Sequence, residues 1–191
     1  MPSVFRTSLP LRTTDDPDPA ARAPLMAVQA SMGMVPNMYA GMVNLPALLE
    51  TYNYGYAKFR AEAGFTPVEQ EVVLLAISRF NRCHYCVAAH SFVADMMSKV
   101  PTEVTDAIRD GRPIPDARLE ALRAFAHAMT ESRGNPTTEQ AEAFLQAGFT
   151  EQHILGIVLA ISVKVISNYS NHIFHTELDP AFAGRAWSPA T

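Results

Sequence analysis

Residues 65–90 read FTPVEQEVVLLAISRFNRCHYCVAAH, and this stretch predicts two consecutive helices. Thr66 suits the N-cap and Pro67 the first helical position, and an acid stands three residues after Thr66, where a capping box needs it. The apolar run that follows extends this helix to about residue 81. A second helix is expected over residues 83–98. Both cysteines of the chain therefore lie in a segment that is expected to be helical.

The same helical periodicity continues through most of the chain, and no segment has a convincing strand pattern. Further helices are expected at residues 20–32, 45–63, 101–110, 116–132, 137–147 and 150–172. The first 19 residues are rich in Pro, Asp and Thr, which predicts an extended arm or one that wraps around a partner. Residues 20–191 are expected to form a single all-α domain.

An internal repeat is suggested by residues 63–86 and 147–170, which align without a gap. The segments AGFT and LAIS recur at one fixed offset, and Cys83 and Cys86 align with Ser167 and Ser170. A duplication would give two helical halves, centred on residues 63–97 and 147–175, of which only the first keeps its sulfur atoms. The alternative is chance similarity between two amphipathic helices.

Composition excludes several classes of partner. The chain has 191 residues, a formal net charge of −4 and no run of Lys or Arg, so neither nucleic acid nor an anionic membrane surface is expected as a partner. The N-terminus lacks the apolar segment of a secretory signal. The most apolar stretch, 154–167, contains Lys164 and is shorter than the ~20 residues of a membrane span, which predicts a buried helix. A cytoplasmic location is expected, where a close cysteine pair is typical of catalysis or metal binding.

The spacing of Cys83, Cys86 and His90 favours thiol chemistry. At about 100° per residue, all three side chains share one stripe of a helix, and the imidazole leans back over Cys86. Helix N-termini favour a thiolate, and an imidazole one turn away can accept the thiol proton. A second thiol nearby can trap a sulfenic acid as a disulfide. On helix-dipole grounds alone, Cys83 would be the attacking thiol, whereas the position of His90 favours Cys86.

Two alternatives remain open for this cluster. Zinc could be held by the two thiolates and His90, with Glu71 as a fourth ligand, although no second ligand pair lies nearby. The other alternative is that these side chains only pack in the core and take part in no chemistry. Glu71 either orients His90 from the flank of a buried helix or is simply an acid that favours the helix dipole.

Glu71, followed twelve residues later by Cys83 and then CHYCVAAH, resembles the core motif of the alkylhydroperoxidase AhpD and carboxymuconolactone decarboxylase-like superfamily. The motif spans about residues 66–90, and chain length, helical content and the tail NHIFHTELDP (171–180) resemble the peroxidase-related subgroup. The decarboxylase branch lacks the cysteine pair, so lactone decarboxylation is not expected.

The resemblance implies a role for each residue of the motif. Cys86 would be the peroxidatic thiolate, Cys83 the resolving thiol, and His90 the base, with Glu71 completing the proton relay. No bound cofactor or metal is implied. An external dithiol reductant, lipoyl-like or thioredoxin-like, would return the disulfide to thiols, and dimers, trimers or hexamers are expected.

One position departs from the family pattern. In the best-known AhpD enzymes the residue before the second cysteine is a relay histidine, whereas here it is Tyr85, and His84 is displaced by one position. This change bears on the strength of the relay and on the use of a lipoyl reductant.

Other candidate residues have more ordinary explanations. His172 and His175 are expected to cap a helix end or contact a subunit. The methionines at 32, 34, 38 and 42 fit core or interface packing. The aromatic residues from Tyr52 to Phe59 are expected to line a substrate pocket or to pack against a partner subunit.

The sequence therefore predicts a thiol-dependent peroxidase that reduces small hydroperoxides through Cys83 and Cys86. The alternative from another class is a helical redox-sensor or zinc-clip scaffold without turnover.

Overall fold

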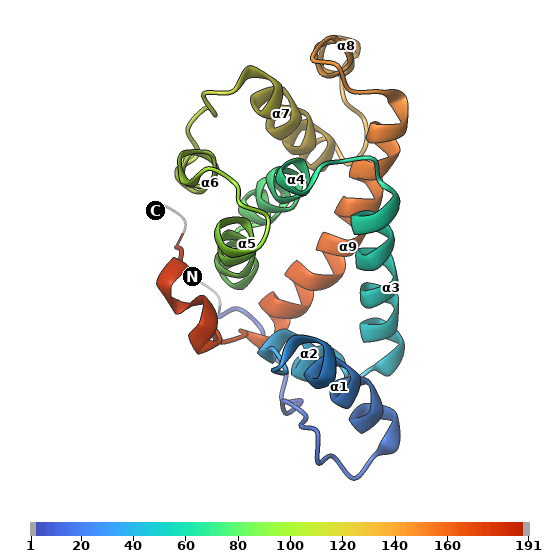
Figure 1. Ribbon diagram of the computed structural model, residues 1–191. Coiled ribbons are helices and arrows are strands. Elements are labelled where there is room, and N and C mark those ends of the chain that lie inside the picture. Colours follow the sequence, from blue (N-terminus) through green and yellow to red (C-terminus); the bar gives the residue numbers. More distant parts are fainter. Residues whose placement is uncertain (1–2, 189–191) are drawn as a thin grey trace.

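The computed structural model describes residues 3–188 and is helical throughout (Figure 1). Its helices are α1 (Pro19–Met32), α2 (Asn37–Met42), α3 (Pro46–Glu62), α4 (Pro67–Phe80), α5 (His84–Met96), α6 (Thr102–Asp110), α7 (Ala117–Glu131), α8 (Thr138–Gln146), α9 (Glu151–Phe174) and the 3₁₀ helix η1 (Pro180–Arg185). Between residues 3 and 188 there is no strand. The all-α prediction is confirmed.

The helix boundaries follow from side-chain caps. At the start of α4, the Glu69 N–H donates to Thr66 Oγ1 (3.3 Å) and the Thr66 N–H donates to Glu69 Oε2 (2.9 Å), which is the capping box expected from the sequence. Asp116 caps α7 in a similar way by accepting from the Leu119 N–H. These caps satisfy N–H groups that the helices leave without intrahelical partners.

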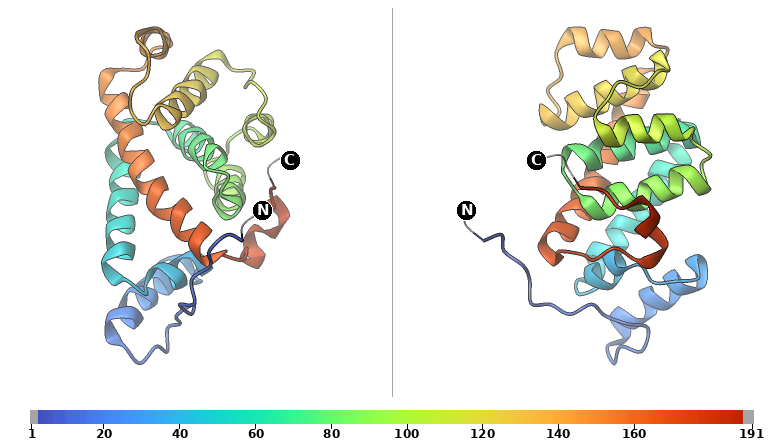
Figure 2. Two further views of the ribbon diagram at one scale, coloured as in Figure 1. Left: turned by 180° about the vertical axis from the view of Figure 1, so that it is seen from behind. Right: turned by 90° about the vertical axis from the view of Figure 1, so that its left-hand side faces the viewer.

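Helix α9 crosses the molecule diagonally and packs against α3, α4, α2, α5 and α7 (Figure 1). Helices α7 and α8 lie at one end and α1 and α2 at the other (Figure 2). By length and hydropathy α9 resembles a membrane span, a property that core helices of soluble proteins share. Its buried residues Ile157, Ala160 and Val163 join the two hydrophobic clusters of the protein, which agrees with the predicted buried helix.

The two AGFT segments have the same local structure. Gly64 and Gly148 both adopt left-handed backbone angles, with φ of +82° and +89°, which a residue with a side chain adopts at a cost. The phenylalanines that follow, Phe65 and Phe149, are buried and pack together with ring centroids 6.2 Å apart. The duplication itself stays a prediction.

The N-terminal arm lies extended along its own chain. The Thr7 N–H donates to the Ile173 carbonyl at the end of α9, and the Arg12 N–H donates to the Ala40 carbonyl in α2, both at 3.0 Å. Residues 1–2 of the predicted arm and 189–191 of the predicted domain lie outside the described residues.

Three local features differ from the sequence prediction. Helix α2 and the 3₁₀ helix η1 were not expected, because a segment of six residues is too short to show helical periodicity. The helix predicted from residue 83 begins one residue later, because Cys83 has extended backbone angles (φ −85°, ψ 98°) and forms the N-cap of α5.

Candidate active site

A tight turn between α4 and α5 places the two cysteines. Arg82 adopts a left-handed conformation (φ 55°), and the Cys83 N–H donates to the Ser78 carbonyl at 3.0 Å. Cys86 then falls in the first turn of α5, near N–H groups that favour negative charge. The predicted single helical stripe therefore holds for Cys86 and His90, whereas Cys83 reaches Cys86 from the cap position.

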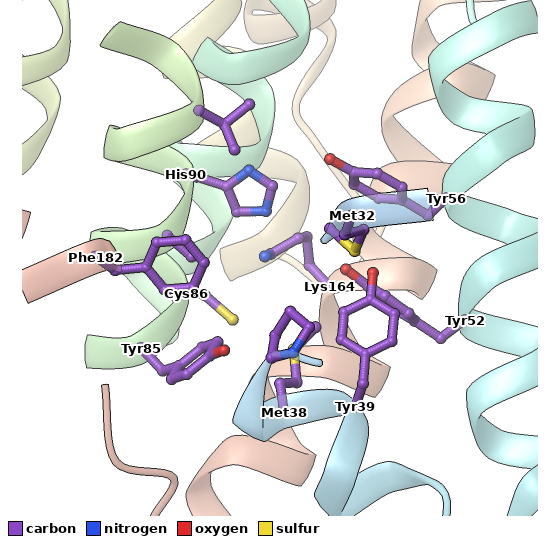
Figure 3. A pocket seen from close by; sticks show the side chains of 13 residues that line it. Met32, Met38, Tyr39, Tyr52, Tyr56, Tyr85, Cys86, His90, Lys164 and Phe182 are labelled. Carbon is purple, nitrogen blue, oxygen red and sulfur yellow. The ribbon is translucent and has the colours of Figure 1, made fainter. Parts of the chain in front are cut away.

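Cys86 and His90 face a cavity of about 90 Å³ between α5, α9 and the N-terminal helices (Figure 3). Four tyrosines form much of its wall, and none of the lining residues is acidic. The residues that line it are Met32, Pro36, Met38, Tyr39, Tyr52, Tyr56, Tyr85, Cys86, Ala89, His90, Val93, Lys164 and Phe182. By the same measure of volume about 10–15 Å³ holds one water molecule, so the cavity has room for a ligand of a few heavy atoms.

The Cys86 sulfur is buried among groups that stabilise a negative charge. Asn171 donates from Nδ2 to Cys86 Sγ at 3.2 Å. Burial raises the pKa of the Cys86 thiol, but the hydrogen bond from Cys83, the nearby Lys164 and His90 side chains and the hydrogen bond from the Asn171 amide outweigh it and hold this pKa well below its usual range.

The pKa of the neighbouring thiol, Cys83, is shifted in the opposite direction. The hydrogen bond to Cys86, burial and the charge on Cys86 all raise the pKa of Cys83. Of the two sulfur atoms, Cys86 is therefore the thiolate and Cys83 keeps its proton, although the helix-dipole argument alone pointed to Cys83.

His90 is held from behind by a buried carboxylate. Its Nδ1 lies 3.0 Å from Oε2 of Glu71, whose Oε1 lies 2.5 Å from Nη2 of Arg60. Burial raises the pKa of Glu71, but His90 and Arg60 outweigh burial and lower it below its ordinary value. An ionised Glu71 accepts the Nδ1 proton, which leaves Nε2 of a neutral imidazole as the basic atom. Burial and the charge of Lys164 lower the pKa of His90 despite Glu71, which keeps the ring neutral.

Cys83 borders a second groove, separate from the Cys86 cavity. This groove, of about 430 Å³, lies between the N-terminal arm, the start of α5 and the end of α9. It is lined by Val4, Arg82, Cys83, His84, Tyr85, Asn171, His172, His175 and Thr176. The two cysteines are therefore buried residues that line two different openings, Cys86 the cavity and Cys83 the groove.

Tyr85 helps to close the cavity through the C-terminal segment. Its hydroxyl donates to Asp179 Oδ2 at 2.5 Å, and Asp179 also accepts from the Asn37 N–H at the start of α2. Its ring packs edge-on against Phe182 of η1, at 5.9 Å between centroids. Tyr85 thus lines the cavity and holds the C-terminal segment in place, and it does not take the place of a relay histidine.

Residues 46–131, which span α3 to α7 and the whole motif, match the model of the carboxymuconolactone decarboxylase family. An uncharacterised peroxidase-related protein with an AhpD core from Ralstonia eutropha JMP134 superposes with a TM-score of 0.80 at 22% identity, over 98% of this chain and 100% of that one. Residues 46–131 thus resemble the carboxymuconolactone decarboxylase family, and the chain as a whole has the AhpD-like fold.

Two further structures with this AhpD-like fold are similar. A peroxidase-related protein from Silicibacter sp. TM1040 gives a TM-score of 0.78 at 20% identity, over 96% of both chains. The debrominase Bmp8, in a variant complexed with 2,3,4-tribromopyrrole, gives 0.73 at 16% identity, over 94% of this chain and 96% of that one. No curated protein sequence matches the chain. At these identities the structural likenesses establish the AhpD-like fold and leave the reaction open.

The other residues singled out in the sequence lie around this AhpD-like core in ordinary roles. His84 is exposed and packs against Trp187. His175 ends α9 and contacts the Phe5 carbonyl in the arm through Nε2, at 3.2 Å, whereas His172 is exposed. Tyr52 lines the cavity and Phe59 lies in the core.

The zinc alternative has no ligand set in the part of the chain from residue 3 to residue 188, where no three His, Cys, Asp or Glu side chains are placed around one point. Glu71, its expected fourth ligand, directs one carboxylate oxygen to His90 and the other to Arg60.

Sequence reasoning missed several residues of the site. Arg60, Asn171, Asp179 and Phe182 come from segments far from the cysteines, and their positions carry no local motif. Lys164 did carry a signal, because a charged residue inside a long apolar helix is rarely buried without a function.

Proposed function

We propose that this protein is a thiol-dependent peroxidase that reduces small hydroperoxides through a Cys83–Cys86 dithiol-disulfide cycle. One observation carries the proposal. The Cys86 sulfur lines a small cavity beside His90, accepts a hydrogen bond from Asn171, and has the protonated Cys83 next to it. A thiolate, a base and a resolving thiol are the three parts that peroxide reduction by cysteine needs.

The reaction begins with Cys86 as the thiolate and His90 as the neutral imidazole, whose ring Glu71 holds through Nδ1. Nε2 of His90 takes the proton of the bound hydroperoxide while the thiolate attacks its terminal oxygen, so an S–O bond forms and the O–O bond breaks. The departing oxygen takes the proton from His90 and leaves as the alcohol, or as water when the substrate is hydrogen peroxide. Cys86 is left as the sulfenate, which takes a proton from water to give the sulfenic acid.

Resolution uses the neighbouring thiol. The Cys83 sulfur attacks the sulfenic sulfur of Cys86, the disulfide forms, and hydroxide leaves with the Cys83 proton as water. A dithiol reductant then reverses the oxidation and becomes a disulfide itself.

We place the entry of this reductant at the groove that borders Cys83. Thiol–disulfide exchange is faster when the leaving thiol has a low pKa, and here the better leaving group is Cys86. Attack on Cys83 from the groove releases that sulfur, while the peroxide cavity stays on the other side of the pair.

Stopped-flow mixing of the reduced protein with hydrogen peroxide and with an organic hydroperoxide tests the proposal. Rapid oxidation should give an intact mass lower by two hydrogens, and peptide mapping should place the crosslink between Cys83 and Cys86. Lack of oxidation by either peroxide would leave the redox-sensor or scaffold alternative in its place.

A second candidate is reductive debromination of an aromatic ring, favoured by the four tyrosines around a nucleophilic sulfur and by the likeness to Bmp8. Two thiols balance this reaction, because they become a disulfide while the C–Br bond becomes C–H and hydrogen bromide is released. An engineered cavity of about 150 Å³ holds benzene, so a cavity of about 90 Å³ is small for a brominated ring. Peroxide reduction therefore fits the site better. Incubation with tribromopyrrole and bromide measurement distinguishes the two.

A further inference from the structure

Lys164 is a buried cation for which the protein provides no conventional partner. Its side chain projects from α9 into the cavity, with only 1% of its surface exposed (Figure 3). Among the described residues, its Nζ atom has no hydrogen-bond partner. An ammonium removed from water without an anion is costly, by several kcal/mol. Such a group therefore indicates an anion at the same place.

The candidates for this anion are few. No Asp or Glu lines the cavity. The nearest carboxylate of the relay, Glu71, is already bound to His90 and Arg60. The hydroxyl groups of Tyr56 and Tyr85 are hydrogen-bonded to Arg60 and Asp179. This leaves the Cys86 sulfur as the one group of the described cavity wall that readily becomes an anion near neutral pH.

We propose that Lys164 is a catalytic residue whose ammonium is the counter-ion of the Cys86 thiolate and then of the oxygen that departs from the hydroperoxide. During the attack the negative charge moves from sulfur to the distal peroxide oxygen, across the space that Figure 3 shows between Cys86, His90 and Lys164. The ammonium stabilises the charge at both ends of this path. The proton that completes the alcohol comes from His90.

The same charge also affects the base. Its field favours the ionised form of Cys86 and disfavours the protonated form of His90, whose pKa it lowers after the larger effect of burial. Lys164 thus makes the thiolate without itself taking the proton, and it leaves His90 neutral to act. The first half of the proposal concerns the resting thiol, and only the second half rests on the proposed peroxidase function.

The test of the first half is alkylation of Cys86 by iodoacetamide between pH 5 and 10 in the Lys164→Met variant. A Cys83→Ser background isolates one sulfur, and His90, Tyr39, Tyr52 and Tyr85 remain as the other titratable groups that face it. The rate at pH 7 should fall at least ~10-fold, because each unit by which the thiol pKa rises reduces the thiolate tenfold. Lys58→Met, at an exposed residue of α3 paired with Glu62, is the matched control and should label like the parent. An unchanged rate in Lys164→Met would overturn the proposal.

A second measurement does not depend on a variant that folds. The chain has three lysines, Lys58, Lys99 and Lys164, so a protein labelled with ¹⁵N at lysine Nζ gives an assignable spectrum. Alkylation of Cys86 with a neutral reagent removes the anion and should shift the Lys164 signal while the other two stay in place. Three unmoved signals would contradict the ion pair.

The second half is tested by peroxide kinetics in the full-length protein. With wild type and Lys164→Met compared at pH values that give equal thiolate fractions, the variant should still lose about 100-fold in kcat/KM, as enzymes do when a stabilising donor is removed. Equal rates there would restrict Lys164 to the resting thiolate. A wild-type protein that labels fast but reacts with neither peroxide would refute the proposed function while the ion pair stands.

Discussion

Nδ1 of His90 and Oε2 of Glu71 are 3.0 Å apart in the interior of the protein, nineteen positions apart in sequence. This contact fixes the tautomer of the imidazole, so that the nitrogen available to Cys86 is Nε2. It also joins the cysteine–histidine motif of α5 to helix α4.

The two cysteines should respond differently to substitution. Cys86→Ser should remove all reaction with peroxide, because the nucleophile is gone. Cys83→Ser should keep one fast oxidation, after which the sulfenic acid accumulates and is trapped by dimedone, as seen by mass spectrometry. If instead Cys83→Ser were inert and Cys86→Ser reacted, the assignment of the two sulfur atoms would be reversed.

The His90–Glu71 pair should raise the rate at which peroxide oxidises Cys86, and it should not be essential for peroxide binding. His90→Gln should lower the oxidation rate of Cys86 by about 10²–10³-fold, within the range that general-base catalysis supplies. Its measurement is stopped-flow oxidation under single-turnover conditions. His127→Gln, at a partly exposed residue of α7, is the matched control. A His90→Gln protein that is oxidised at the wild-type rate would exclude the relay.

Glu71→Gln should cost stability as well as rate. Glu71 is fully buried and Arg60 is its partner at 2.5 Å, so the neutral amide leaves a largely buried guanidinium without its counter-charge. Breaking a buried ion pair from one side typically costs about 3–5 kcal/mol. Urea unfolding should show this loss, whereas Glu62→Gln, at an exposed pair on α3, should change little.

Stability should fall as the solution is acidified from pH 7 to pH 5. The pKa of His90 in the folded protein lies below its ordinary value of about 6.5, so in this range the unfolded chain binds a proton that the folded one does not. The stability that neutral His90 contributes is present above about pH 6.5 and is lost as pH falls toward its folded pKa. Thermal unfolding of wild type and His90→Gln should show a smaller pH dependence in the variant. Equal slopes would contradict the lowered pKa.

Asp179→Asn should weaken the attachment of the C-terminal segment that carries Phe182, and it should change the selectivity between hydroperoxides. The loss of charge weakens the hydrogen bonds from Tyr85 and Asn37, and Phe182 then holds the cavity wall less firmly. We expect a loss of about 1–3 kcal/mol in stability, as for a weakened buried hydrogen bond to a charged group. The KM for an organic hydroperoxide should rise more than the rate with hydrogen peroxide falls. An equal change in the kinetics with both peroxides would argue that the C-terminal segment does not select between them.

Local signals predicted most of the fold. Thr66 and Pro67 mark the start of α4 because capping acts within one turn, and that kind of signal is readable from sequence. Helix α2 was missed because six residues do not complete two turns. Cys83 was assigned to a helix because spacing cannot distinguish an N-cap from the first helical residue.

The candidate site was predictable only as far as it is local. Cys83, Cys86 and His90 lie within eight residues, and Glu71 is one helix away. Lys164, Asn171 and Phe182 reach the same cavity from the other end of the chain, and only tertiary packing brings them there.

The place of Phe182 has a consequence for how the protein is made. This residue is synthesised after every α-helix, yet it forms part of the wall of the cavity that Cys86 lines. Chains are built from the N-terminus at about 5–20 residues per second. For a short time the nascent chain therefore carries the thiol motif without the part of the cavity wall that Phe182 forms. We therefore expect selective chemistry only once the last-made segment has docked, and until then we expect the Cys86 sulfur to be open to any oxidant in the surroundings.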